Sequence, residues 1–289
     1  MSRAVLLIRH LPPERFRAFE RGLAAAGYQV AHTAGFRPAP GDILVSWNRY
    51  GTAEVLCDQW ERDGGVVLVA ENGYVGTERG VARHYAIGLD SHNDPAGVVV
   101  PEDAQPGERS RDVFGLDPAP WQRNRSDTNG AGAPGGHILI APNRSFGRRG
   151  RIMPEDWADQ VARQVRAIAH GREVRIRRHP GTAVPPTPLA ADLAGAFCAV
   201  VWSSSVGVAA LLAGVPVIAL APAWIGQRAA SRELADVLDP PRPARNPALD
   251  DIAWGMWTPA EVEAGAPFKH LAPAIAARVA LQAGVRAAS

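Results

Sequence analysis

The sequence of 289 residues contains little cysteine: Cys57 and Cys198 are its only two, and neither lies in the spacing of a metal site or a redox pair. No apolar run reaches the roughly 18 residues that a membrane span needs. The apolar start, Ala4–Arg9, breaks into charge and proline without a small-residue cleavage site, which favours a first strand over a signal peptide. These absences predict a protein of the cytoplasm with no transmembrane segment.

Lysine is almost missing as well. Lys269 is the only lysine among 31 basic residues, which stand against 29 acidic residues, and the formal net charge is +2. A charge so close to balance gives no reason by itself to predict nucleic-acid binding. Hydrophobic residues make up 46% of the chain and charged residues 21%, so the chain can bury a core.

Several common signatures are absent too. The chain has no G-x-G-x-x-G after its first strand, no P-loop, no H-E-x-x-H and no D-x-D. The first absence weakens the case for a dinucleotide-dependent oxidoreductase. With the other signals also missing, the sequence predicts no metal site.

What the chain does have is an alternation of strand and helix patterns that occurs twice. In the first stretch we expect strands at Ala4–Arg9, Tyr28–Thr33, Asp42–Trp47 and Gly65–Ala70, and helices at Pro13–Tyr28 and Ala53–Asp63. In the second we expect strands at His137–Ala141, Glu173–Arg178, Cys198–Trp202 and Pro216–Leu220, and helices at Pro154–Gly171 and Val206–Ala213. This α/β alternation indicates parallel sheets covered by helices, and its repetition predicts two Rossmann-like domains.

A break in the pattern suggests where one domain ends. The segment Arg123–Gly136 is rich in Gly, Asn and Ser, which is typical of a linker. We therefore expect an N-terminal domain over residues 1–130 and a C-terminal domain over 136–270. The remaining residues, 271–289, contain a helical segment, Pro273–Ala288, that we expect to pack back on the N-terminal domain.

The first segment with possible chemistry follows the expected strand Gly65–Ala70. Glu71 at the carboxyl end of a parallel strand suits a general base, and Gly73 would let a substrate approach. Asn72 and Gly73 would then lie on the acceptor side. The alternative is an ordinary Asn-Gly turn with a solvated Glu71.

Two further segments follow strands of the second stretch. His179 could donate a hydrogen bond to a departing phosphate, with Arg178 sharing its charge, and Pro180 belongs to the same expected donor-binding segment; the alternative is a surface histidine before a proline turn. Ser203, Ser204 and Ser205 precede a helix, where free N–H groups and the helix dipole favour a phosphate. One serine would satisfy an N-cap, and three leave spare donors.

Weaker candidates complete the set. Arg144 lies in the loop Pro142–Arg149 after the first strand of the second stretch, and it could contact a nucleotide or belong to a solvated flank. His92 and Asn93 are acceptor-side candidates in the first stretch. Four tryptophans could stack on a base or a sugar, or else pack in the core: Trp202, Trp224, Trp254 and Trp257.

Taken in order, three of these segments resemble the motifs of bacterial capsule polysaccharide transferases of the Kdo-transferring and polysialic-acid-synthesising kinds. Those enzymes carry an acidic-x-Gly motif in the first domain, and a His-Pro motif and a Ser/Thr-rich motif in the second. The matching residues here are Glu71-Asn72-Gly73, His179-Pro180 and Ser203–Ser205. The chain is also similar to glycosyltransferase-like proteins of phages and prophages, through Ala70–Gly76, Met153–Trp157, His179–Gly181 and Ala253–Trp257.

The resemblance implies a glycosyltransferase of the GT-B type, with a cleft between its two Rossmann-like domains. It implies an inverting, metal-independent transfer from a CMP- or UDP-linked nucleotide sugar, with no other cofactor. By the same resemblance Glu71 deprotonates the acceptor hydroxyl, His179 stabilises the leaving phosphate and Ser203–Ser205 hold it. The family's acidic pair is Glu71-Asn72 here, so this motif supplies only one carboxylate.

The acceptor and the class of function stay open at this level. The acceptor could be an envelope saccharide or, in a phage-infected host cell, a hydroxymethylated pyrimidine of DNA. A DNA acceptor would need a basic track, which Arg144–Arg151 and Arg175–Arg178 could supply, and a flipped base. A binder of nucleotide sugar or nucleic acid without turnover, and an epimerase or phosphorylase on the same scaffold, are the competing functions.

Overall fold

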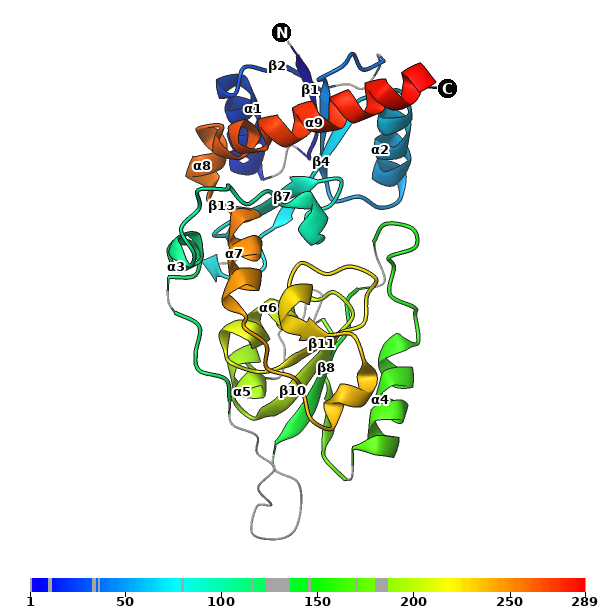
Figure 1. Ribbon diagram of the computed structural model, residues 1–289, viewed down its shortest axis with the longest axis vertical. Helices are drawn as coiled ribbons and strands as arrows, with labels where there is room; N and C mark the ends of the chain where they lie inside the picture. Colours follow the sequence, from blue (N-terminus) through cyan, green and yellow to red (C-terminus); the bar gives the residue numbers. More distant parts are fainter. Residues whose placement is uncertain are drawn as a thin grey trace. The chain divides into compact units, whose positions relative to one another are not determined.

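The computed structural model describes residues 2–9, 12–32, 35, 37–78, 81–115, 117–122, 136–144, 147–169, 171–179 and 187–288. The chain divides into two compact units (Figure 1): unit 1 comprises Met1–Ala104 and Asp251–Ser289, and unit 2 comprises Gln105–Asp250. These bounds differ from the expected ones, because the chain enters unit 2 at residue 105 and returns to unit 1 at residue 251. The expected linker lies, up to residue 135, outside the described residues.

Unit 1 is built on a mixed sheet with the strand order β13-β7-β4-β3-β1-β2. Its strands are β1 (Arg3–Leu7), β2 (Gln29–Ala31), β3 (Ile43–Trp47), β4 (Val66–Asn72), β7 (Tyr85–Leu89) and β13 (Met256–Trp257). The strands β1 to β4 are parallel, as their apolar runs predicted, and β7 and β13 are antiparallel additions. A short hairpin of β5 (Thr77–Glu78) and β6 (Val81–Ala82) lies between β4 and β7 in sequence.

Helices cover both faces of this sheet. They are α1 (Pro13–Ala25), α2 (Thr52–Arg62), α8 (Pro259–Glu263) and α9 (Ala266–Ala288), with the short η1 (Pro95–Gly97). On one face α1 buries Phe19 and Leu23, which the helical spacing in the sequence predicted. On the other face α2 buries Cys57 and Trp60 against alternate residues of the same strands. Successive strand residues point to opposite faces, so one run of apolar residues serves both layers.

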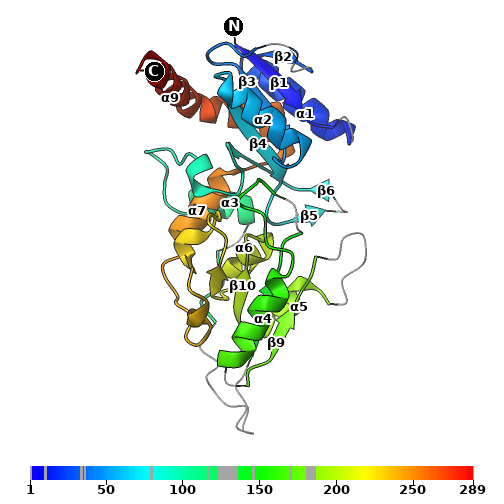
Figure 2. The same cartoon turned by 90° about the vertical axis from the view of Figure 1, so that its right-hand side faces the viewer.

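The C-terminal segment is an integral part of unit 1 (Figures 1 and 2). The predicted helix at Pro273–Ala288 is confirmed but starts earlier, at Ala266, so Pro273 lies inside it. Buried side chains of this segment join the core cluster of unit 1: Trp257, Val262, Phe268, Leu271 and Ile275. Where α8 crosses α1, a Cβ on Gly22 would lie 1.8 Å from the Val262 carbonyl oxygen, so only glycine permits this approach.

Unit 2 contains a five-stranded parallel sheet with the order β12-β11-β10-β8-β9. Its strands are β8 (His137–Ala141), β9 (Val174–Ile176), β10 (Ala196–Val201), β11 (Val217–Ala219) and β12 (Ala230–Ser231). Its helical segments are α3 (Glu108–Phe114), α4 (Trp157–Ile168), α5 (Leu189–Ala194), α6 (Ser205–Leu212), η2 (Gln227–Ala229) and η3 (Leu234–Val237), and α7 (Asn246–Trp254) carries the chain back to unit 1. The α/β class with two units, each on a largely parallel sheet, is confirmed.

The strand order of unit 2 reverses direction at β8. From β8 the chain passes through α4 to β9 on one side, and then through α5 to β10 on the other side. Such a reversal is a topological switch point, where loops diverge and ligands bind in open α/β sheets. None of the helices that the structure describes combines the length and apolar character needed to cross a membrane.

Candidate functional site

Polar residues of unit 2 gather where three adjacent parallel strands end. Asn143 and Arg144 follow β8, His179 follows β9 and Ser203 follows β10. The carboxyl ends of parallel strands lie at one edge of the sheet, and the gap between β8 and β10 is the switch point. The strand order therefore brings together three sequence segments that the sequence could only place separately. We refer to Asn143, Arg144, His179 and Ser203 as the strand-end cluster.

Two hydrogen bonds join Asn143 to Ser203 across this switch point. The Asn143 Oδ1 accepts from the Ser203 backbone N–H at 3.0 Å, and the Asn143 Nδ2 donates to the Ser203 Oγ at 3.0 Å. The contact spans 60 residues of sequence, so it locks the loop after β8 to the loop after β10.

The three serines have different environments. The Ser204 Oγ accepts from the Val206 N–H at 3.3 Å and caps α6, as the capping alternative predicted, while its expected contact with a phosphate stays a prediction. Ser205 is the exposed first residue of α6. Ser203 is the serine held by Asn143, and it is the one attached to the strand-end cluster.

His179 and Arg144 lie within electrostatic reach of each other. Partial burial, and after it the charge of Arg144, lower the pKa of His179 below its ordinary value. A cationic side chain beside an exposed imidazole suits an anion that touches both. Pro180, which the sequence grouped with His179, lies outside the described residues.

The neighbouring arginines face carboxylates of their own unit. Arg178 donates two 2.9 Å bonds to Asp159 on α4, Arg177 pairs with Asp192, and the Arg175 Nε lies 2.7 Å from Glu173. The expected role of Arg178 at a donor phosphate would require it to leave Asp159. The expected basic track over residues 175–178 is therefore largely neutralised by local ion pairs.

Two of the four tryptophans lie near the strand ends of unit 2 and serve packing. Trp224 is fully buried, and its ring lies so close to α6 that a Cβ on Gly207 would approach it to 2.5 Å. Trp202 donates from Nε1 to the Arg151 carbonyl at 2.9 Å and packs edge-on against Trp157. In unit 1 Trp257 is buried and Trp254 stacks on His270.

In unit 1 the motif Glu71-Asn72-Gly73 does not form the turn that its Asn-Gly pair suggested. Glu71 and Asn72 continue β4 and pair with Ala86 and Tyr85 of β7, because the antiparallel neighbour β7 extends the strand. Adjacent strand residues point to opposite faces, so the Glu71 and Asn72 side chains diverge. Asn72 on the acceptor side would act apart from Glu71.

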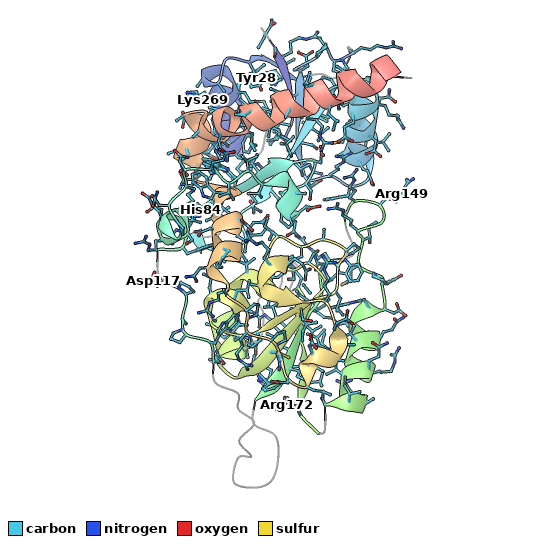
Figure 3. All side chains as sticks on the ribbon, in the orientation of Figure 1. Tyr28, His84, Asp117, Arg149, Arg172 and Lys269 are labelled. Carbon is cyan, nitrogen blue, oxygen red and sulfur yellow. The ribbon has the colours of Figure 1, made fainter. Side chains whose placement is uncertain are left out.

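Gly73 is required by packing. Its N–H donates to the His84 carbonyl at 2.8 Å, and a Cβ there would lie 2.9 Å from that oxygen and 3.0 Å from the Met256 Cε. His84, labelled in Figure 3, immediately precedes β7 in the chain. The close contacts with His84 and Met256 account for a glycine at this position, and the approach of a substrate to Gly73 stays a prediction.

Glu71 lies in a charged, aromatic setting at the carboxyl edge of the sheet. Its Oε1 accepts from the Asn72 N–H at 2.9 Å. Its charge acts on Arg15 in the first turn of α1, whose guanidinium lies 4.0 Å from the ring centre of Trp47. Burial lowers the pKa of Arg15, and the nearby Tyr85 and Glu71 offset part of that effect. No pattern in the sequence points to Arg15, because its position near Glu71 depends on which helix starts beside β4.

The expected acceptor-side residues His92 and Asn93 form a turn after β7. The Tyr74 hydroxyl donates to the His92 carbonyl, and the two rings stack with centroids 6.4 Å apart. Burial lowers the pKa of His92 to about 4, so this imidazole is neutral at pH 7. The Asn93 N–H donates to the Ser91 Oγ at 3.2 Å. The structure thus joins the turn to Tyr74, which follows the Glu71 motif.

The chemistry available differs between the units. The strand-end cluster offers cationic and hydroxyl donors, which suit an anion such as a phosphate. Unit 1 offers a carboxylate, Glu71, beside a cation. Among the described residues no group of three or more His, Cys, Asp and Glu side chains is placed to hold a metal ion.

Comparison with solved structures adds a fold relationship. The Thermosulfurimonas dismutans KpsC, beta Kdo 2,4 transferase, aligns over 88% of this chain and 90% of its own, with a TM-score of 0.54 and 12% identity. The chain shares the fold of this Kdo transferase. The beta Kdo 2,7 transferase of the same KpsC aligns over 88% and 89% with a TM-score of 0.49 and 12% identity. No protein-family model and no curated protein sequence matches the chain.

Proposed function

We propose that this protein is a glycosyltransferase that moves a sugar from a nucleotide-activated donor to an acceptor hydroxyl. The observation that carries the proposal is the strand-end cluster at the switch point of unit 2, in a chain that shares the fold of a Kdo transferase. Cationic and hydroxyl donors at that edge suit the phosphate of a nucleotide sugar.

In unit 2 three side chains bind the donor phosphate. Ser203 donates from its hydroxyl, His179 donates from its imidazole, and Arg144 supplies charge. As the bond between the anomeric carbon and the phosphate oxygen breaks, its electron pair stays on that oxygen, and these donors stabilise the charge. Since positive and hydroxyl groups take this task, the proposed reaction needs no metal ion, and EDTA should leave its rate unchanged.

In unit 1 Glu71 takes the proton of the acceptor hydroxyl. The acceptor oxygen forms the new bond to the anomeric carbon, and its proton passes to the Glu71 carboxylate. With one carboxylate acting as base the transfer inverts the anomeric configuration. The NMR couplings or chemical shifts of the product's anomeric centre test this step: retention would overturn the base role of Glu71.

A saccharide is the acceptor we propose, and Kdo on CMP is the donor to test first, because one solved structure with this fold is a Kdo transferase. The ion pairs of Arg175, Arg177 and Arg178 remove much of the basic track that a DNA acceptor would need. Hydroxymethylated DNA is therefore the comparison arm of the acceptor assay.

The test is a thermal-shift panel of CMP, UDP and their sugars, CMP-Kdo included, on wild type, Ser203→Ala, His179→Ala and Glu71→Gln. A ligand at a hundred times its Kd should add about 2.7 kcal/mol of stability. We expect a shift with one donor that is blunted in the first two variants and intact in Glu71→Gln. The same donor should give product with wild type and at least about a hundredfold less with Glu71→Gln. If a folded sample shifts with none of them, the proposal fails.

A further inference from the structure

At the switch point of unit 2, Asn143 makes more hydrogen bonds to Ser203 than are needed to hold the two loops together. Asn143 binds both the backbone N–H and the hydroxyl of Ser203, each at 3.0 Å. A loop could be fixed by either bond alone. The pair of bonds fixes in addition which way the amide of Asn143 faces, and that has a consequence for the Ser203 hydroxyl.

The backbone N–H can only donate, so the Asn143 carbonyl oxygen must face it. The Nδ2 of the same amide then necessarily faces the Ser203 Oγ. An amide N–H₂ can only donate, so the hydroxyl accepts at this contact and directs its own proton away from Asn143. The orientation of the amide therefore follows from the chemistry of the backbone.

We propose that Asn143 is a positioning residue that sets Ser203 as a hydrogen-bond donor toward the donor phosphate. The inference rests on the proposed function of the strand-end cluster. An anion needs donors, and a serine hydroxyl that is free to rotate can present either a proton or a lone pair. By taking up a lone pair of Ser203, Asn143 preorganises the hydroxyl for an anionic ligand.

A residue that only locked the loop would act differently. Its removal would lower the stability of the unliganded protein and would weaken binding independently of the Ser203 hydroxyl. A residue that acts through the hydroxyl loses its effect once the hydroxyl is gone. A double-mutant cycle separates the two cases, since contacting residues that act as one unit are not additive.

The experiment measures Kd for CMP, UDP and inorganic phosphate by calorimetry on four full-length proteins: wild type, Asn143→Ala, Ser203→Ala and the double variant. A hydrogen bond to a charged ligand corresponds to about a tenfold change in Kd or more. We expect each single variant to lose about tenfold and the double variant to lose no more than either. An additive loss of about a hundredfold would overturn the positioning role.

A second pair of variants guards against loss of folding in Asn143→Ala. Asn143→Asp keeps an acceptor for the Ser203 N–H but offers a carboxylate oxygen to the hydroxyl, so the hydroxyl turns its proton inward. We expect Asn143→Asp to unfold at wild-type urea concentrations and to bind at least about tenfold more weakly. Asn246→Asp, an exposed residue of unit 2 with the same charge change, should bind as wild type.

Asn143→Asp also adds a negative charge, and the double variant Asn143→Asp/Ser203→Ala controls for it. If Asn143→Asp lowers the affinity equally whether or not the Ser203 hydroxyl is present, repulsion of the anionic ligand explains the loss and the positioning role is overturned. Wild-type Kd in Asn143→Asp would overturn it as well. If wild type binds CMP or UDP and only the cycle is additive, the donor site stands and the role of Asn143 falls. If wild type binds none of the three probes, both fall.

Discussion

For a single residue, the sequence reveals which chemistry the side chain can perform, and the fold determines which groups surround it. The residue types Glu71, His179 and Ser203 were predictable from their chemistry and from the strands before them. Their environments were not, because each depends on a neighbour far away in sequence: Arg15 for Glu71, Arg144 for His179 and Asn143 for Ser203.

His179 leads to a prediction about pH. Burial and the charge of Arg144 hold its pKa below the ordinary histidine value, so it is neutral at pH 7. A bound phosphate favours the charged form, and linkage then requires affinity to rise as pH falls toward that lowered pKa. We expect the nucleotide sugar that binds in the thermal-shift panel to bind more tightly at pH 5.5 than at pH 7.5. His179→Gln should bind with little dependence on pH, and an unchanged pH profile in that variant would contradict the role.

Gly73 gives a second residue-scale prediction. A Cβ at this position would press on the His84 carbonyl and the Met256 methyl, so Gly73→Ala should lower the free energy of unfolding of unit 1 by about 1–3 kcal/mol. Gly284→Ala is the matched control, since no atom lies within 4 Å of a Cβ there and its helical backbone favours alanine. Urea unfolding measures both. Equal stability of Gly73→Ala and wild type would show that the backbone at His84 moves to make room for the methyl group.

At the scale of elements, close helix contacts decide the arrangement. The crossing of α1 and α8 depends on Gly22, and the middle of α9 is held by an ion pair between Arg278 and Asp90. Neither contact has a signal in the sequence, because a glycine inside a helix pattern reads only as a weak helix former. The helix α1 itself was predictable from the spacing of Phe16, Phe19 and Leu23.

Gly22→Ala tests this contact, because helix propensity and packing predict opposite changes in the free energy of unfolding. Helix propensity alone would stabilise α1 by up to about 1 kcal/mol. The clash with the Val262 carbonyl should instead destabilise unit 1 by about 3 kcal/mol or more, since backbone must move. Arg17→Ala, at an exposed position of the same helix, should change stability by less than about 0.5 kcal/mol. Urea unfolding with a stabilised Gly22→Ala would contradict the packing.

At the scale of the whole molecule, unit 1 is made of two distant pieces of chain. Residues 1–104 provide most of its sheet, and residues 251–289 provide β13, α8 and α9. The second piece contributes fully or almost fully buried side chains to the core, so the first piece alone would expose an apolar face.

Fragments test this division. We expect residues 105–250 to unfold cooperatively in urea by themselves, because unit 2 contains a complete parallel sheet with its own core. Residues 1–104 alone should lack a cooperative transition, and joining them to 251–289 by a flexible linker should restore it. Circular dichroism and NMR dispersion measure the outcome. A folded 1–104 fragment would contradict the shared core.

Local apolar periodicity in the sequence is enough to predict the α/β class, seven of the helices and strands of unit 1 and six of those of unit 2. Three features emerge only in the folded protein: β7 extends β4 through Glu71 and Asn72, β13 returns to the sheet of unit 1, and Asn143 holds Ser203. Each of these depends on pairing between residues far apart in the chain. Such pairing is set by packing and hydrogen bonding in three dimensions, which no local pattern records.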